Sequence, residues 1–283
     1  MPVQKVSLTC VPTAFPIIVL RHRFRVARIS VNMIVVIPAR FASSRLPGKP
    51  LLRETGQFLI EHVYERAMQV KSATAVVVAT DDLRIYAAVT QFGGRAMMTR
   101  DDHSSGTDRV AEVAMQFPNA DVILNLQGDE PLFDPEAIDA LAAMMRETRT
   151  DVGTLATPIR NHADYNSRNC VKVVCDDTGR AMYFSRSPIP CVRDGEPDFH
   201  AEPPLFLQHV GIYAYRRETL LRLAQTPPHP IETAEKLEQL RLLATGGVIR
   251  VGIIAQAHRG VDTPEDYAAF IEFTRATARR RAA

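Results

Sequence analysis

Three cationic side chains, Arg40, Arg45 and Lys49, lie within ten residues of one another directly after an apolar run. Holding like charges this close costs free energy unless an anion lies between them. A triphosphate suits the group, because arginine forks onto phosphate oxygens and lysine acts as a point charge. The segment is not a Walker loop, because Ser43 stands at the first required glycine and Pro50 follows the lysine where Ser or Thr is required. A solvated basic loop without a ligand is the alternative.

Two acidic residues, Asp129 and Asp262, stand in predicted loops next to residues that already account for helix capping. Capping by Asp129 or its neighbour is the alternative, but Asp134 occupies the N-cap position of the helix that follows. Thr263 likewise precedes a proline at a first helical position, which leaves Asp262 free for other contacts. Two carboxylates at loop ends can share a magnesium ion that is also bound to phosphates. Spacing alone leaves this pairing open.

Further candidates are polar residues beside apolar segments. Ser105 and Gly106 open a predicted helix, where small residues and free N–H groups can hold a ligand or simply cap the helix. Five other polar residues stand within or beside apolar elements, where each alone is more typical of a satisfied structural group. A polyhydroxylated acid needs such a set, with arginine for the carboxylate and amide, imidazole and phenol groups for the hydroxyls. These five are Arg186, His209, Tyr213, Glu238 and Gln239.

The elements that must position these residues alternate regularly from residue 33 onward. Short β-branched runs predict buried parallel strands, and apolar residues at helical spacing predict helices between them. This alternation implies right-handed strand–helix–strand units and a doubly wound α/β sheet. The second half is richer in strands, which predicts one α/β domain with an inserted β-rich subdomain. The expected strands are 34–37, 75–79, 95–98, 121–126, 152–157, 171–174, 181–184, 209–215 and 248–254, and the expected helices are 58–70, 83–89, 107–117, one from 135, 233–244 and one from 264.

The charge of the chain is unevenly distributed. Its 34 Lys and Arg and 32 Asp and Glu give a net charge of +2, but residues 1–32 hold five cations and no acid, and residues 275–283 hold four arginines and no acid. The remainder, 33–274, therefore carries −7, which excludes a basic nucleic-acid-binding core. We expect 1–32 to be a poorly ordered extension, 33–274 a single domain and 275–283 a basic tail. No apolar run approaches the length of a membrane span, and the four cysteines fit no familiar metal spacing.

Six segments, in order, resemble the signatures of the 3-deoxy-manno-octulosonate (KDO) cytidylyltransferase family, and the likeness runs from about residue 33 to 273. The resemblance implies a nucleotide-diphospho-sugar transferase-like fold and transfer of CMP from CTP to the anomeric hydroxyl of KDO. It further implies a product used in lipopolysaccharide assembly, a cytoplasmic location and a homodimer, with no nucleic-acid or membrane partner. The segments are 35–50 (VVIPARFASSRLPGKP), 127–131 (QGDEP), 183–190 (YFSRSPIP), 209–213 (HVGIY), 237–241 (LEQLR) and 261–266 (VDTPED).

The same resemblance implies a role for each matched residue. Lys49, Asp129 and Asp262 would be catalytic, with the two aspartates holding Mg²⁺ and no covalent enzyme intermediate. The nucleotide would contact Arg40, Arg45, Lys49, Arg100, Ser105 and Gly106, and the sugar acid would contact Gln127, Arg186, His209, Tyr213, Glu238 and Gln239. The rivals are a cytidylyltransferase for another sugar acid, a glycosyltransferase of the same fold, and a non-enzymatic module that binds a nucleotide or nucleic acid through the basic ends of the chain.

Overall fold

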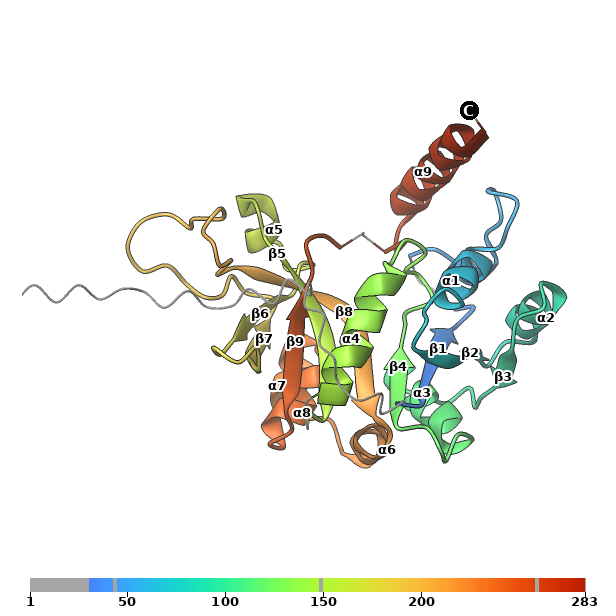
Figure 1. Ribbon diagram of the computed structural model, residues 1–283, viewed down its shortest axis with the longest axis horizontal. Coiled ribbons are helices and arrows are strands. Elements are labelled where there is room, and N and C mark those ends of the chain that lie inside the picture. Colours follow the sequence, from blue (N-terminus) through green and yellow to red (C-terminus); the bar gives the residue numbers. More distant parts are fainter. Residues whose placement is uncertain (1–30, 43–44, 148–149, 258–259, 283) are drawn as a thin grey trace, which may run out of the picture.

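The structure of the protein is a computed structural model that describes residues 31–42, 45–147, 150–257 and 260–282. The predicted extension 1–32 lies almost wholly outside these ranges. Within them, nine strands form one sheet whose main path has the order β3-β2-β1-β4-β8-β5-β9 (Figure 1). The strands are β1 (Met33–Ala39), β2 (Ala73–Thr80), β3 (Ala96–Met98), β4 (Val122–Asn125), β5 (Val152–Pro158), β6 (Lys172–Cys175), β7 (Ala181–Ser185), β8 (Leu207–Arg216) and β9 (Ile249–Ile253).

Helices cover both faces of the sheet, which confirms the doubly wound α/β fold. One buried cluster joins the sheet to Ile60 of α1 and Leu141 of α4. The other joins the opposite face to Val110 of α3 and Leu220 of α6. The helices are α1 (Leu59–Ala67), α2 (Leu83–Gln91), α3 (Gly106–Met115), α4 (Pro135–Glu147), α5 (His162–Asn166), α6 (Arg217–Gln225), α7 (Pro230–Glu235), α8 (Gln239–Ala244) and α9 (Pro264–Ala282).

Strand direction decides which loops meet. Strands β1 to β4 are parallel, and all seven residues of β1 are buried, as expected of a parallel strand covered on both faces. Strand β8 runs antiparallel to its neighbours β4 and β5. Val36 of β1 pairs with Asn125 of β4, and Asn125 lies opposite Tyr213 of β8. The middle of β8 therefore reaches the edge of the sheet at which β1 and β4 end.

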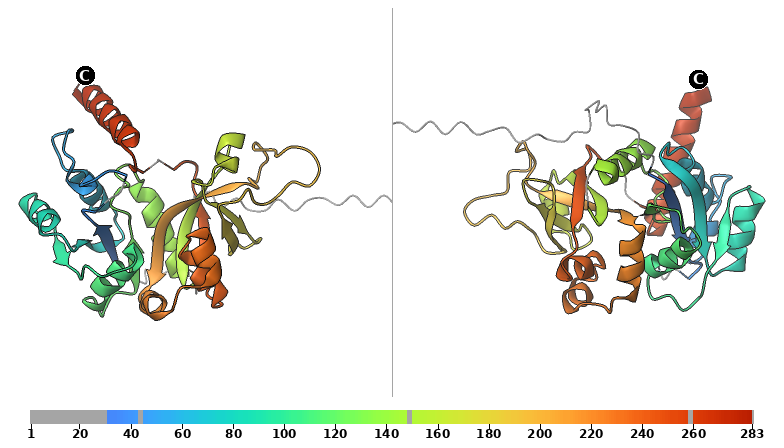
Figure 2. Two further views of the ribbon diagram at one scale, coloured as in Figure 1. Left: turned by 180° about the vertical axis from the view of Figure 1, so that it is seen from behind. Right: turned by 60° about the horizontal axis from the view of Figure 1, so that its bottom comes forward.

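The β-rich insertion is a hairpin that stays attached to the main sheet. Strands β6 and β7 pair with each other, and β6 also pairs with β8. The turn between them is closed by Gly179, whose N–H donates to the carbonyl of Asp176 at 2.9 Å and whose φ is +78°. A small separate core lies beside the hairpin, and segment 190–204 projects from this side of the molecule (Figure 2). The small core consists of Ile159, Tyr165, Cys170, Phe199 and Phe206.

The prediction of one helix over 233–244 is wrong. The segment forms two short helices, α7 and α8, separated where Lys236 takes the left-handed conformation with φ 54°. A buried ion pair between Glu232 and Arg241, at 2.6 Å, holds the two helices against each other. Apolar spacing across the break resembles a single helix, because Leu237 and Leu240 both face the core.

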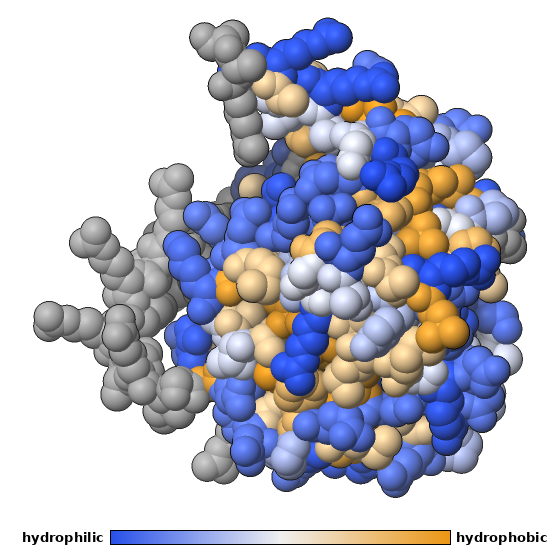
Figure 3. Space-filling view, turned by 90° about the vertical axis from the view of Figure 1, so that its right-hand side faces the viewer, coloured by the Kyte–Doolittle hydropathy of each residue, from blue (hydrophilic) through white to orange (hydrophobic). Residues whose placement is uncertain are grey.

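Helix α9 extends away from the sheet (Figure 1). Thr263 caps it, since its hydroxyl oxygen accepts the N–H of Asp266 at 3.2 Å. The basic residues from 275 to 282 continue this helix. No helix among the described residues is long and apolar enough to cross a membrane. On the side of the molecule where α2 lies, hydrophobic and hydrophilic residues are intermixed (Figure 3).

Candidate active site

The loops that carry the predicted cations and carboxylates meet beyond the ends of β1 and β4. A Cβ atom on Gly128 would lie 2.9 Å from the carbonyl oxygen of Pro38, so only glycine lets the loop after β4 pass this close to β1. The N–H of Val261 donates to the carbonyl of Asp129 at 2.8 Å, which ties the loop before α9 to the same place. Residues far apart in the chain therefore form one site.

Lys49 lies between the two predicted metal ligands. Its Nζ contacts a carboxylate oxygen of Asp129 at 2.6 Å and one of Asp262 at 3.1 Å, and its side chain is only 13% exposed. Arg45 contacts the other oxygen of Asp262 at 3.1 Å. Arg40 is exposed and forms no ion pair within the described ranges. The structure thus brings Arg45, Lys49 and both aspartates together, at the end of the strand that Arg40 follows.

The carboxylates do not cap helices. Asp134 caps α4 through its contact with the N–H of Glu136 at 2.9 Å, as expected, and Asp129 is left to Lys49. Among the described residues, no group of three or more acidic, His or Cys side chains could hold a metal ion by itself. Two hard oxygen donors side by side still fit Mg²⁺, which binds through one or two carboxylates plus phosphates and water.

Glu130 is a member of this cluster that the sequence did not single out for a role. Burial raises the pKa of Glu130 to about 8, with further contributions from Asp129 and Asp262 that Lys49 partly offsets. A Cβ on Gly260 would lie 2.9 Å from its Oε1 atom, so this carboxyl group fills the space between the two loops. A neutral Glu130 limits the negative charge that one lysine must balance.

The loop that carries Arg40, Arg45 and Lys49 (the cationic loop) is stabilised by a contact that the sequence did not predict. The guanidinium of Arg84 lies 3.3 Å from the centre of the Phe41 ring. Gly48, at φ +67°, closes the loop, since its N–H donates to the Phe41 carbonyl at 3.2 Å and a Cβ there would press on the same ring. Asp82, the N-cap of α2, holds Arg84 through both carboxylate oxygens. Phe41 is therefore clamped between α2 and the start of the short 3₁₀ helix Lys49–Leu51.

The predicted cytidine residues lie beside the same strand end. Ser105 is the N-cap of α3, and its hydroxyl oxygen accepts the N–H of Asp108 at 3.1 Å. A Cβ atom on Gly106 would lie 3.6 Å from the Pro38 ring, so the start of α3 lies next to the cationic loop. Capping thus accounts for Ser105 in the absence of a ligand, while the side chain of Arg100 is exposed and pairs with Asp102 at 2.9 Å.

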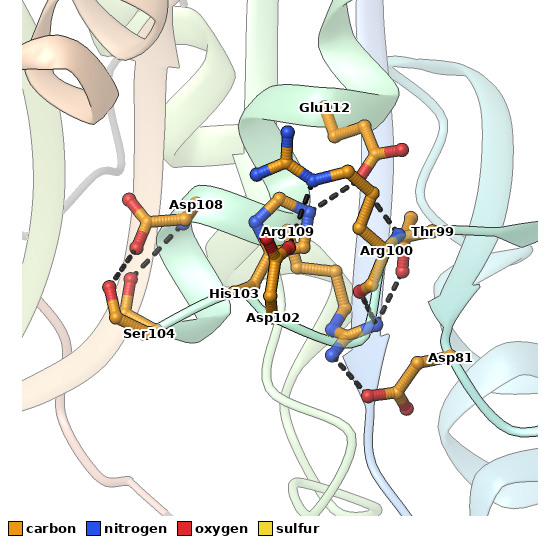
Figure 4. A network of polar contacts seen from close by, with 10 residues as sticks. Asp81, Thr99, Arg100, Asp102, His103, Ser104, Asp108, Arg109 and Glu112 are labelled. Carbon is orange, nitrogen blue, oxygen red and sulfur yellow. Dashed lines mark hydrogen bonds and ion pairs between the residues drawn. The ribbon is translucent and has the colours of Figure 1, made fainter.

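Buried charge fixes the loop that holds these residues (Figure 4). Arg109 is fully buried and donates to Asp81 at 2.7 Å and to the carbonyl of Arg100 at 3.3 Å. Glu112 accepts the backbone N–H of Arg100 at 3.1 Å and also contacts His103. Both backbone groups of Arg100 are thereby engaged, and its exposed side chain pairs with Asp102 alone among the described residues.

The residues predicted to contact the sugar acid, termed the predicted acceptor residues, are connected by contacts that begin at the end of β4. The Nε2 atom of Gln127 donates to Asn125 Oδ1 at 3.1 Å, and Asn125 lies opposite Tyr213. The rings of His209 and Tyr213 lie 5.2 Å apart. Burial raises the pKa of Tyr213, with smaller contributions from Tyr215 and from the nearby carboxylate of Glu238. These groups therefore share one region of the molecule.

Arg186 and Gln239 complete this set at the break between α7 and α8. Arg186 donates to the carbonyls of Arg168, Glu235 and Lys236 at 2.9, 2.7 and 3.3 Å, which uses three of its five N–H groups. Gln239 is only 7% exposed, and its Nε2 has no hydrogen-bond partner among the described residues. A buried amide without a partner is costly, and a ligand oxygen would satisfy it.

Comparison with known proteins agrees with this layout. The family model described as cytidylyltransferase matches residues 34–251. A 3-deoxy-manno-octulosonate cytidylyltransferase of Syntrophobacter fumaroxidans is 49% identical over 243 residues, which cover 85% of this chain and 96% of that protein. Its namesake in Geobacter sulfurreducens is also 49% identical, over 247 residues that cover 85% and 98%.

A solved structure gives the same result in three dimensions. The structure of CMP:2-keto-3-deoxy-manno-octonic acid synthetase complexed with CTP matches with a TM-score of 0.79 and 47% identity, and the match covers 88% of this chain and 99% of that one. Such identity over nearly the full length of each relative extends to all the elements that carry the site. The chain is thus an enzyme of the nucleotidyltransferase class and belongs to the 3-deoxy-manno-octulosonate cytidylyltransferase family.

Proposed function

We propose that the protein transfers CMP from CTP to the anomeric hydroxyl of KDO and releases pyrophosphate. The observation that carries this proposal is the meeting of Arg45 and Lys49 with Asp129 and Asp262 beyond the ends of β1 and β4. In open α/β sheets this edge is where ligands bind. The names of the relatives, and the CTP bound to one of them, support the choice of nucleotide and acceptor.

On the nucleotide side, the chain supplies charge and rigidity. Arg40 and Arg45 project from the loop with exposed side chains and can fork onto triphosphate oxygens. Lys49 adds a fixed positive charge, already placed by its two carboxylate partners. Asp129 and Asp262 would hold Mg²⁺, which when bound neutralises charge that develops on the phosphate oxygens.

On the acceptor side, the chain orients a polyhydroxylated acid. The two remaining N–H groups of Arg186 can pair with its carboxylate, and the orphaned Gln239 amide can donate to one of its oxygens. Gln127, His209, Tyr213 and Glu238 then face its hydroxyls. Because these groups would hold the anomeric hydroxyl in line with the α-phosphorus, the expected mechanism is direct displacement of pyrophosphate by that hydroxyl.

Direct displacement predicts a single inversion at the α-phosphorus and no covalent CMP–enzyme species. No side chain of the site needs to act as a nucleophile. The hydroxyl oxygen forms the new bond to the α-phosphorus and gives its proton to water, the bond to pyrophosphate breaks, and pyrophosphate leaves with the electron pair. The use of the product in lipopolysaccharide assembly, the cytoplasmic location and the homodimer stay predictions from the family resemblance.

The test is pyrophosphate release from CTP in the presence of Mg²⁺ with KDO, with sialic acid, or with no acceptor. Release that depends on KDO is expected. Release only with sialic acid would instead assign another sugar acid, and release with no acceptor would indicate hydrolysis. If neither KDO nor sialic acid supports release while CTP still binds, the proposed transfer to KDO fails.

A further inference from the structure

A β-bulge lies in the middle of the predicted acceptor site. Across β5 and β8, Thr154 pairs with Tyr213 and the next residue of β5 pairs with Val210, so Gly211 and Ile212 have no partner opposite them. Bulges of this kind re-aim neighbouring side chains and are frequent next to active sites. The hydroxyl group of Thr154, a residue with no exposed surface, lies in the bulge between β5 and β8.

That hydroxyl has three polar neighbours. Its Oγ1 lies 2.8 Å from the carbonyl oxygen of Ile212, 3.2 Å from that of Val210 and 3.0 Å from Nε2 of His209. Both carbonyl oxygens can only accept a hydrogen bond, and the hydroxyl has one proton to give. If that proton pointed at His209, Oγ1 of Thr154 and the carbonyl oxygen of Ile212 would lie 2.8 Å apart with no hydrogen between them.

The proton of Thr154 therefore belongs to a carbonyl, and His209 must donate from Nε2. Burial also disfavours the doubly protonated ring at neutral pH, because it lowers the pKa of His209 to about 3. His209 as a residue is half-buried. Phe184 packs edge-on against it at 5.1 Å and fixes its plane. Its second nitrogen, Nδ1, has no hydrogen-bond partner within the ranges that the structure describes.

We propose that Thr154 is a positioning residue that holds His209 as the neutral Nε2–H tautomer, so that Nδ1 accepts a hydrogen bond from a hydroxyl of the acceptor. The identity of that acceptor rests on the proposed function, whereas the tautomer does not. The arrangement sets a rule of specificity. The group opposite Nδ1 must carry a proton, as a hydroxyl or an ammonium does, and a methyl ether or a fluorine at that position leaves Nδ1 buried without a partner.

The tautomer is directly measurable by NMR of the full protein labelled with ¹⁵N-histidine. The pattern of couplings between ring nitrogens and ring protons distinguishes the two neutral forms, and the His209→Gln variant assigns the signals of this ring. The wild type should show Nε2–H at neutral pH. Thr154→Val, which lacks the hydroxyl, should show a changed or mixed pattern, and Thr154→Ser should restore the original one.

Steady-state kinetics test the consequence for binding. Thr154→Val should raise the KM for the acceptor roughly tenfold, the scale of one lost hydrogen bond, while the KM for CTP stays the same. Thr154→Ser should recover most of the loss. Thr150→Val is the matched control, because Thr150 is also buried and its hydroxyl donates to the carbonyl of Val248 at 3.1 Å, at a position that precedes β5.

Each outcome decides the proposal. An Nδ1–H pattern in the wild type overturns it, and so does a Thr154→Val protein whose tautomer or acceptor KM is unchanged. If Thr154→Val does not fold, the wild-type and Thr154→Ser spectra still decide the tautomer. Failure of KDO as a substrate would leave the NMR result standing, so the two proposals fail separately.

Discussion

The unusual residue of the site is Lys49, whose ammonium group contacts both carboxylates that were predicted to hold a metal. The sequence indicated its charge and its place in the loop, and also indicated that Asp129 and Asp262 were free of capping duties. It could not indicate that one lysine reaches both, because that depends on two loops more than 130 residues apart. Thr154 and Arg84 could not be predicted for the same reason, because neither belongs to a sequence motif and the partners of each are brought close only by the fold.

Replacing Lys49 by methionine should lower kcat/KM for CTP by about 100-fold or more, because a preorganised charge is lost where phosphate charge must be stabilised. The free energy of unfolding should change much less, since both carboxylates keep contact with solvent and Arg45 still pairs with Asp262. Steady-state kinetics and urea unfolding measure the two effects. Lys71→Met, at an exposed position, is the control, and a Lys49→Met enzyme with wild-type kcat/KM would contradict this role.

Replacing Asp129 by asparagine should abolish most turnover while the protein still folds. The amide keeps the shape but loses the charge that a divalent cation needs, and Asp262 continues to pair with Lys49. Turnover is measured with Mg²⁺ raised to saturation. Asp134→Asn is the control on the same loop, because asparagine caps a helix as well as aspartate does. Near-normal turnover of Asp129→Asn at saturating Mg²⁺ would exclude its predicted role.

At the scale of elements, alternating apolar runs predicted the strands and most helices, since burial against a common core imposes the period that is read in the sequence. The break between α7 and α8 was not predicted, because the apolar spacing continues across it. What ends α7 is the left-handed Lys236, and the carbonyls left there are satisfied by Arg186 from another element. Backbone conformations stabilised by distant partners cannot be read from local periodicity.

Replacing Arg84 by methionine should raise the KM for CTP two- to fivefold, because the clamp on Phe41 that orders the cationic loop is lost. The value of kcat should change less, since no residue at the reacting atoms is altered. Arg95→Met is a matched control, because Arg95 stacks on Phe117 at 5.0 Å, away from the loop. Equal effects of the two substitutions on the KM for CTP would show that the clamp has no positioning role.

For the whole molecule, the net charge of +2 conceals an acidic body in which one loop, Arg40 to Lys49, concentrates positive charge. In the folded chain part of that charge is balanced by Asp129 and Asp262. Buried histidine adds a second whole-molecule property, the dependence of stability on pH. Burial holds the pKa of His209 near 3, well below its unfolded value of about 6.5.

Acid should therefore destabilise the protein through His209. Between pH 6.5 and 3 the unfolded chain binds a proton that the folded chain does not, so the free energy of unfolding falls as pH falls. From pH 7 to 5.5 the wild type should lose about 1 kcal/mol more than His209→Gln in urea unfolding. Glu130, whose pKa is raised, contributes equally to both proteins. His162→Gln, at an exposed site, should behave as the wild type does, and parallel pH profiles for wild type and His209→Gln would contradict the prediction.

The reversed direction of β8 has a further consequence, for how such an enzyme can diversify. Apart from Gln127, the predicted acceptor residues lie on β8, the β6–β7 hairpin and the α7–α8 pair, whereas the triphosphate residues lie on the first half of the chain and at Asp262. Asn125 and Tyr213 meet at the seam between the two halves. Substitutions between β5 and β9, residues 152–253, can therefore alter the choice of sugar acid during evolution while the nucleotide chemistry stays the same.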